Sequence, residues 1–186
     1  MPPSAGGREV DAVRILGTIL VATAGLLSPE EGFAEQRAYS ALTLAQAIQL
    51  AGLGAGTLPI SLTSHRDPAT SAGVEAWTVF GEDGQPVEIL VYTESPTFQC
   101  ANRYPNPNWQ CRLKLASVIV HEAWHYRTSR DEEAAYQVQV AFLVQHGASP
   151  QVIGGVYRAR NQVVARQRQL AEARRKAGFT ARVVRE

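Results

Sequence analysis

One segment in the second half of the chain, residues 113–147, limits the possible folds more than any other. It has no proline and no glycine before Gly147, and its first residues are mainly apolar, which is typical of a helix in a protein core. The apolar run leads into His-Glu-Ala-Trp-His, residues 121–125. Residues four apart share one face of a helix, so His121 and His125 can present two imidazoles to one point, with Glu122 rotated from both.

The spacing of these three side chains is that of a zinc site. Two neutral imidazoles bind a borderline-soft cation such as Zn²⁺, and a water in the open coordination position then has a pKa of about 7. A carboxylate that is not a ligand, here Glu122, can accept a proton from such a water and pass it to a leaving group. We therefore predict His121 and His125 as metal ligands, Glu122 as the catalytic base and Zn²⁺ as the cofactor.

A zinc site of this kind needs a third protein ligand, and the acidic residues that follow the motif can supply it. Thr128 and Ser129 weaken the first helix, and Ser129-x-x-Glu132 can cap a second one. That helix is predicted to run to His146 and to end at Gly147, with Pro150 beyond it. Two carboxylates, Glu132 and Glu133, stand at its start. A capping role for Glu132 would favour Glu133 as the ligand, and helical periodicity alone does not choose between them.

His-Glu-x-x-His followed by a helix with Glu-x-x-Ala-Tyr resembles the gluzincin group of zinc metallopeptidases, especially its smallest members, over residues 87–147. The resemblance implies a zincin-like α+β fold and the hydrolysis of peptide bonds in a peptide or protein substrate. It also implies that Glu132 is the third zinc ligand and that Tyr136 buttresses the site. A hydrogen-bond donor to the oxyanion is usual in such enzymes, and the candidates here are Tyr136, His146 and Tyr157.

The first half of the chain predicts a helix followed by a small sheet. Residues 33–51 have a helical apolar period, and three glycines end it. Residues 57–63 alternate as a short strand, and residues 76–80 and 87–92 flank an Asp-Gly turn as a hairpin. The second strand of the hairpin, residues 87–92, is either the sheet edge nearest the site, where an extended peptide can add, or an ordinary core strand. The loop of residues 93–112 is expected either to form the rim of the cleft or to be pinned to the body by its aromatic residues.

Charge is spread unevenly along the chain. The formal net charge of +1 gives no reason to expect a polyanionic partner for the whole chain. Residues 158–186, however, hold nine of the 18 lysines and arginines and only two acidic residues. Residues 151–176 are predicted to form a helix with a narrow apolar stripe. Its basic outer face is either solvated or in contact with an anionic partner, and no clear nucleic-acid or membrane signal accompanies it.

The interpretation of two further features depends on whether the protein is exported or stays in the cytosol. Cys100 and Cys111 are the only cysteines; they form a disulfide if the protein is exported and remain thiols in a reducing cytosol. Residues 15–27 are an apolar run that is too short to span a bilayer. This run is predicted to form either a helix packed on the core or part of a signal sequence at residues 8–27. A cytoplasmic location is favoured. We predict three parts of the chain: a disordered N-terminus at residues 1–9, a zincin-like metallopeptidase domain at residues 10–150, and a C-terminal basic helix and tail at residues 151–186.

Two other kinds of protein remain compatible with the sequence. One is a catalytically inert zinc-binding module that recruits a partner through its basic helix, in which Glu122 would be neutralised in an ion pair. The other is a helical interaction protein that binds no metal, in which His121 and His125 are surface residues beside a solvated glutamate. The apolar approach to the motif and the acidic cluster after it favour a zinc-dependent metallopeptidase over both.

Overall fold

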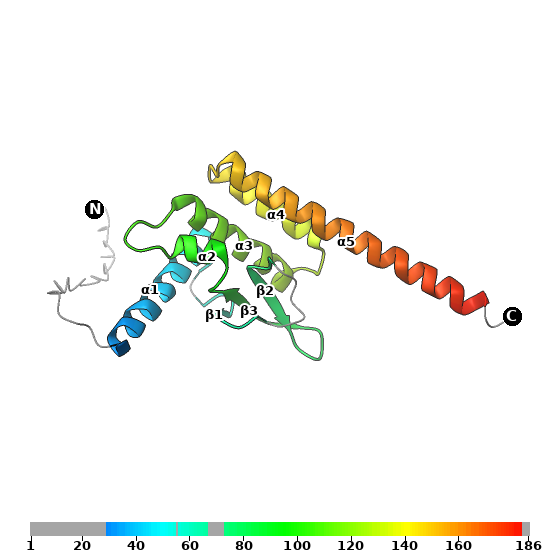
Figure 1. Ribbon diagram of the computed structural model, residues 1–186, viewed down its shortest axis with the longest axis horizontal. Helices are drawn as coiled ribbons and strands as arrows, with labels where there is room; N and C mark the ends of the chain where they lie inside the picture. The colour runs from blue at the N-terminus through cyan, green and yellow to red at the C-terminus, as the bar shows by residue number, and fades with distance from the viewer. Residues whose placement is uncertain (1–28, 55, 67–72, 184–186) are drawn as a thin grey trace, which may run out of the picture.

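The computed structural model describes residues 29–54, 56–66 and 73–183. These residues form five helices and three short strands, which confirms the predicted α+β class (Figure 1). In chain order the elements are α1 (Pro29–Leu50), β1 (Ile60–Thr63), β2 (Ala76–Phe80), β3 (Pro86–Tyr92), α2 (Pro96–Ala101), α3 (Trp109–Arg127), α4 (Glu132–Gln145) and α5 (Pro150–Val183). The predicted disordered start, residues 1–9, and the apolar run, residues 15–27, lie outside the described residues.

The sheet has the strand order β1-β3-β2, with β1 parallel and β2 antiparallel to β3. The hairpin is confirmed, but the proposal that its second strand forms the edge is wrong, because β3 lies in the centre and β2 is at the edge. The physical reason is burial. Ile89 and Val91 of β3 are fully buried, and a strand with two paired neighbours suits such residues better than an edge strand does.

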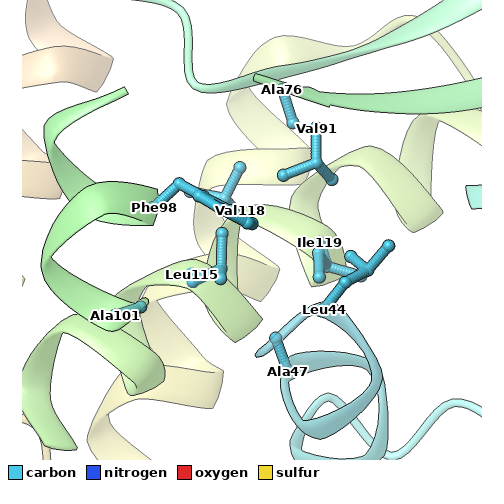
Figure 2. Packing of buried hydrophobic residues seen from close by; sticks show 9 residues of the cluster. All are labelled: Leu44, Ala47, Ala76, Val91, Phe98, Ala101, Leu115, Val118 and Ile119. Carbon is cyan, nitrogen blue, oxygen red and sulfur yellow. The ribbon is translucent and has the colours of Figure 1, made fainter. Parts of the chain in front are cut away.

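Helix α3 is the central element, because it contributes to both apolar cores of the described residues and lies among the other helices and the sheet (Figure 1). On one side, Leu115, Val118 and Ile119 pack with α1, α2 and the sheet in a first core (Figure 2). On the other, Leu113 and Ala116 pack with α4 and the start of α5 in a second core. Two apolar cores thus fix the helix that carries the predicted motif.

The segment of residues 93–112 is not the open rim that one interpretation expected. Its first part forms helix α2, with the Ser95 hydroxyl accepting from the main-chain N–H of Phe98 at 3.1 Å. Phe98 is fully buried in the first core, and a disulfide joins Cys100 to Cys111 at the start of α3. Phe98 and the disulfide therefore pin the segment to the body, as the second interpretation held for Phe98, whereas Tyr104 and Trp109 are exposed.

Helix α5 begins against the body and then projects away from it (Figure 1). Val152 and Val156 belong to the second core, whereas Leu170, farther along the predicted stripe, is 52 % exposed. In the part of the chain that the structure describes, no helix combines the length and apolarity needed to cross a membrane.

Candidate metal centre

Three side chains from two helices converge at the end of α3. His121 and His125 lie on successive turns of that helix, and their Nε2 atoms are 3.1 Å apart. Glu132, the first residue of α4, places Oε2 3.4 Å from Nε2 of His121 and Oε1 3.6 Å from Nε2 of His125. One donor atom from each residue can be chosen so that all three lie within 4.8 Å of one another. The structure thus brings together the three residues predicted as ligands.

These spacings can be tested against zinc. Ligand atoms about 2.0–2.2 Å from a tetrahedral zinc ion lie about 3.3–3.6 Å from one another. The donor separations of 3.1, 3.4 and 3.6 Å are close to this range without any rearrangement of the helices. Two imidazoles and a carboxylate are also the donor set of many catalytic zinc sites, in which a fourth position stays open. The residues therefore fit a zinc ion.

Contacts behind the ligands fix the orientation of both rings. Nδ1 of His125 lies 2.8 Å from the main-chain oxygen of Ser129, which can only accept, so Nδ1 carries the proton and Nε2 is left as the donor atom toward a metal. The ring of His121 packs edge-on between the rings of His125 and Tyr136, with centroids 4.8 and 4.6 Å away. Nδ1 of His121 is buried, and among the described residues it has no hydrogen-bond partner.

The two neighbouring glutamates have different environments. Asp131, and not the predicted Ser129-x-x-Glu132 box, caps α4: its carboxylate accepts from the main-chain N–H groups of Glu133 and Ala134 at 2.9 and 3.2 Å. Glu132 is therefore free of a capping role. The carboxylate of Glu133 points elsewhere and pairs with Arg160 of α5. This arrangement favours Glu132 over Glu133 as the third ligand.

Glu122 lies beside the cluster but outside it. Its side chain is 8 % exposed, and Oε2 is 2.9 Å from the hydroxyl of Thr78 on β2. Burial raises the pKa of Glu122 above its usual value, although His121, Thr78 and His125 oppose the shift. A carboxyl whose pKa is raised from an acidic value comes closer to the working range of a general base at neutral pH.

Only one of the three candidate oxyanion donors reaches the site. Tyr136 packs on His121, and burial, followed by the charge of Glu132, raises its pKa to about 12, so its hydroxyl keeps the proton. His146 instead donates from Nδ1 to the main-chain oxygen of Phe142, and Tyr157 is 44 % exposed. Neither His146 nor Tyr157 lines the cleft that contains the cluster.

The cluster opens into a cleft of about 640 Å³. Its floor is α3, one wall is the edge strand β2, and the other walls are α4 and α5. Much of the lining is apolar and comes from β2, α3 and α5: Trp77, Phe80, Val118, Val156, Ala159 and Val163. Arg130 lies over the Phe80 ring at 4.0 Å and donates to the main-chain oxygen of Gly84, which ties the hairpin to the segment after α3.

Three residues that shape this site are not indicated by any sequence pattern: Thr78, Arg130 and Arg160. Thr78 lies in a predicted strand, but nothing in the strand pattern indicates which residue meets Glu122. The opposite charges of Glu133 and Arg160 were visible, but 27 residues separate them and only the packing of α4 on α5 brings them together. These contacts are tertiary and leave no local signal.

A comparison of the chain with protein-family models, with curated proteins and with solved structures finds no match in any of the three.

Zinc affinity is expected to depend on pH through His125. Burial alone lowers the pKa of His125, but the hydrogen bonds with Glu132 and with the Ser129 carbonyl outweigh it, so the net pKa lies above 6.5. These contacts stabilise the metal-free fold below pH 6.5, and that contribution is lost as the pH rises through the raised pKa. Bound zinc must displace the proton, so affinity should fall by up to about tenfold per pH unit below the pKa of His125.

Competition with a chelating dye between pH 5.5 and 8 measures this dependence. The carboxylate of Glu132 contributes nothing to it, because hydrogen bonds to His121 and His125 lower its pKa to about 2 and keep it ionised throughout. An affinity that stays constant over this range would contradict a site that includes His125.

Proposed function

We propose that the protein is a zinc-dependent metallopeptidase of the gluzincin type. The observation that carries the proposal is the convergence of His121, His125 and Glu132, with Glu122 beside them, at the base of an open cleft. A zinc ion held by these ligands would supply a Lewis acid and an activated water. The α+β arrangement, with the motif helix between a small sheet and a second helix, is compatible with a zincin-like fold.

Residues of the chain itself carry out proton transfer, oxyanion stabilisation and substrate binding. Glu122 accepts a proton from the attacking water and returns it to the leaving amine. The protonated hydroxyl of Tyr136 is the candidate donor to the oxyanion, because it lies in the same cleft. The outer edge of β2 offers main-chain groups to an extended peptide. The apolar walls favour substrates with apolar side chains next to the scissile bond.

The inert zinc-binding module stays the alternative. It would have Glu122 neutralised in an ion pair. Among the described residues Glu122 has no lysine or arginine partner; it is bonded to a hydroxyl and lines the cleft. This environment supports a base that is available to a bound substrate. The basic outer part of α5 as a contact for an anionic partner is a separate proposal that needs no catalysis.

A test uses the zinc-loaded protein and a mixed library of peptides, with the products identified by mass spectrometry. We expect cleavage beside apolar residues, its loss when a chelator removes the metal, and its return when zinc is added back. Stoichiometric zinc with no cleavage of any library member would instead favour the inert module.

A further inference from the structure

Thr78 is the residue of β2 that meets the predicted base. Its hydroxyl lies 2.9 Å from Oε2 and 3.1 Å from the main-chain oxygen of Glu122, so its single proton is donated to one or shared between the two. No other side chain in the described part of the chain is seen to hydrogen-bond the Glu122 carboxylate. A buried carboxylate with one side-chain hydrogen bond takes its position largely from that bond.

The main-chain N–H and C=O of Thr78 lie in the plane of the sheet and point away from β3, toward the outer edge of the sheet in the described part of the chain. In an antiparallel pair, residues alternate between those bonded to the partner strand and those whose N–H and C=O point outward. The Tyr92 N–H donates to the main-chain oxygen of Glu75 at 2.9 Å, so counting along the register places Thr78, opposite Ile89, at an outward position. Consistent with this, the Ile89 N–H donates to Pro59 on the β1 side, not to Thr78.

Strand β2 is also held at a second point, by the segment that follows α3. The ring of Phe80 packs against Arg130, and Arg130 also bonds the turn of the hairpin at Gly84. The strand is therefore fixed beyond Thr78 independently of the contact with Glu122. A loss of the Thr78 hydroxyl should consequently release the glutamate without displacing the strand.

We propose that Thr78 is a positioning residue that holds Glu122 in place and joins it directly to the strand edge that receives the substrate main chain. The inference rests on the proposed function, because it assumes that a ligand at the metal meets Glu122. One residue then presents main-chain groups to the substrate and a hydroxyl to the base. Binding of a peptide at the edge of β2 is therefore coupled to the orientation of the Glu122 carboxylate through Thr78 alone.

The test measures binding of acetohydroxamate to the zinc-loaded protein by calorimetry. A hydroxamate chelates zinc through two oxygens and gives its acidic proton to a neighbouring base, so its affinity reports the position of Glu122. We expect Thr78→Val, which keeps the shape and removes the hydroxyl, to weaken binding by up to about tenfold, because the released Glu122 side chain must then be ordered again when the ligand binds. Thr78→Ser should stay within about twofold of the wild type, because it restores the hydroxyl.

Two controls separate positioning from structure. Combined with Glu122→Gln, Thr78→Val should have no further effect if it acts through Glu122. Thr63→Val makes the same change in the other edge strand, where the hydroxyl donates to the main-chain oxygen of His65, and should leave binding unchanged. Zinc content and circular dichroism are measured for each variant, and Thr78→Ala replaces the valine variant if that one does not fold.

Each other outcome overturns the proposal in a recognisable way. Unchanged affinity in Thr78→Val, an equal loss in Thr78→Ser, or an effect that persists with Glu122→Gln would remove the positioning role and leave the zinc site intact. A wild-type protein that binds no zinc would remove the proposed function, and the role of Thr78 with it.

Discussion

Replacing His121 or Glu132 with alanine is expected to abolish stoichiometric zinc binding. Each residue supplies one of the three donor atoms that converge among the described residues, at separations close to those of a tetrahedral site. Loss of a residue that merely supports a ligand costs about 10- to 100-fold in metal affinity, so loss of a ligand itself should cost more. The measurement is the zinc content of the purified protein by mass spectrometry, followed by titration against a competing chelator.

Glu133→Ala is the matched control for Glu132→Ala. It removes the same side chain one residue later, where the carboxylate pairs with Arg160 and not with the histidines. We expect this variant to keep about one zinc per chain. The reverse result, with zinc lost in Glu133→Ala and kept in Glu132→Ala, would make Glu133 the ligand. Zinc retained in all three variants would show that the metal is bound elsewhere.

The parts of the site that the sequence predicted are those that depend on local geometry. The separation of His121 and His125 is set by the helical repeat. The helix itself could be predicted from the apolar residues before them. The position of Glu132 needed only a short break and a second helix. The cap was predicted wrongly, because Ser129 and Asp131 are both good capping residues and the pattern Ser-x-x-Glu gave weight to the first.

The parts that the sequence did not predict depend on contacts between distant segments. The hairpin was found from its turn, but which strand lies at the edge depends on β1, which pairs with β3 in parallel. Helix α2 was missed because it has only six residues, begins at Pro96 and is followed by a loop that contains Pro105 and Pro107. The contact between Thr78 and Glu122 joins residues 44 positions apart and follows from the packing of the sheet on α3.

Cys100 and Cys111 illustrate a different limit. The sequence left their state open, since it depended on compartment. The structure joins them, and the bridge links the end of α2 to the first turn of α3. Together with the Asn108 side chain, which accepts from the N–H groups of Gln110 and Cys111, it fixes the start of the helix that carries the cluster. The end of that helix is held by the His125–Ser129 contact.

Glu122→Gln should leave zinc bound and reduce peptide hydrolysis by about 100- to 10,000-fold, the range of a lost general base. Glutamine has nearly the same shape and can still meet the Thr78 hydroxyl, but it cannot take a proton from water. Glu122 is not one of the three converging donors, so metal content should not change. The rate is measured on a peptide that the zinc-loaded wild type cleaves.

Glu133→Gln makes the same change in charge at the Arg160 pair, outside the cleft lining, and should leave the rate near that of the wild type. If Glu122→Gln were as active as the wild type, Glu122 would not be the base. Hydrolysis would then have to use another group of the cleft, and the buried carboxylate would be only a structural partner of β2. Loss of both zinc and activity would instead indicate that Glu122 supports the metal cluster, so the two readouts together separate a base from a structural residue.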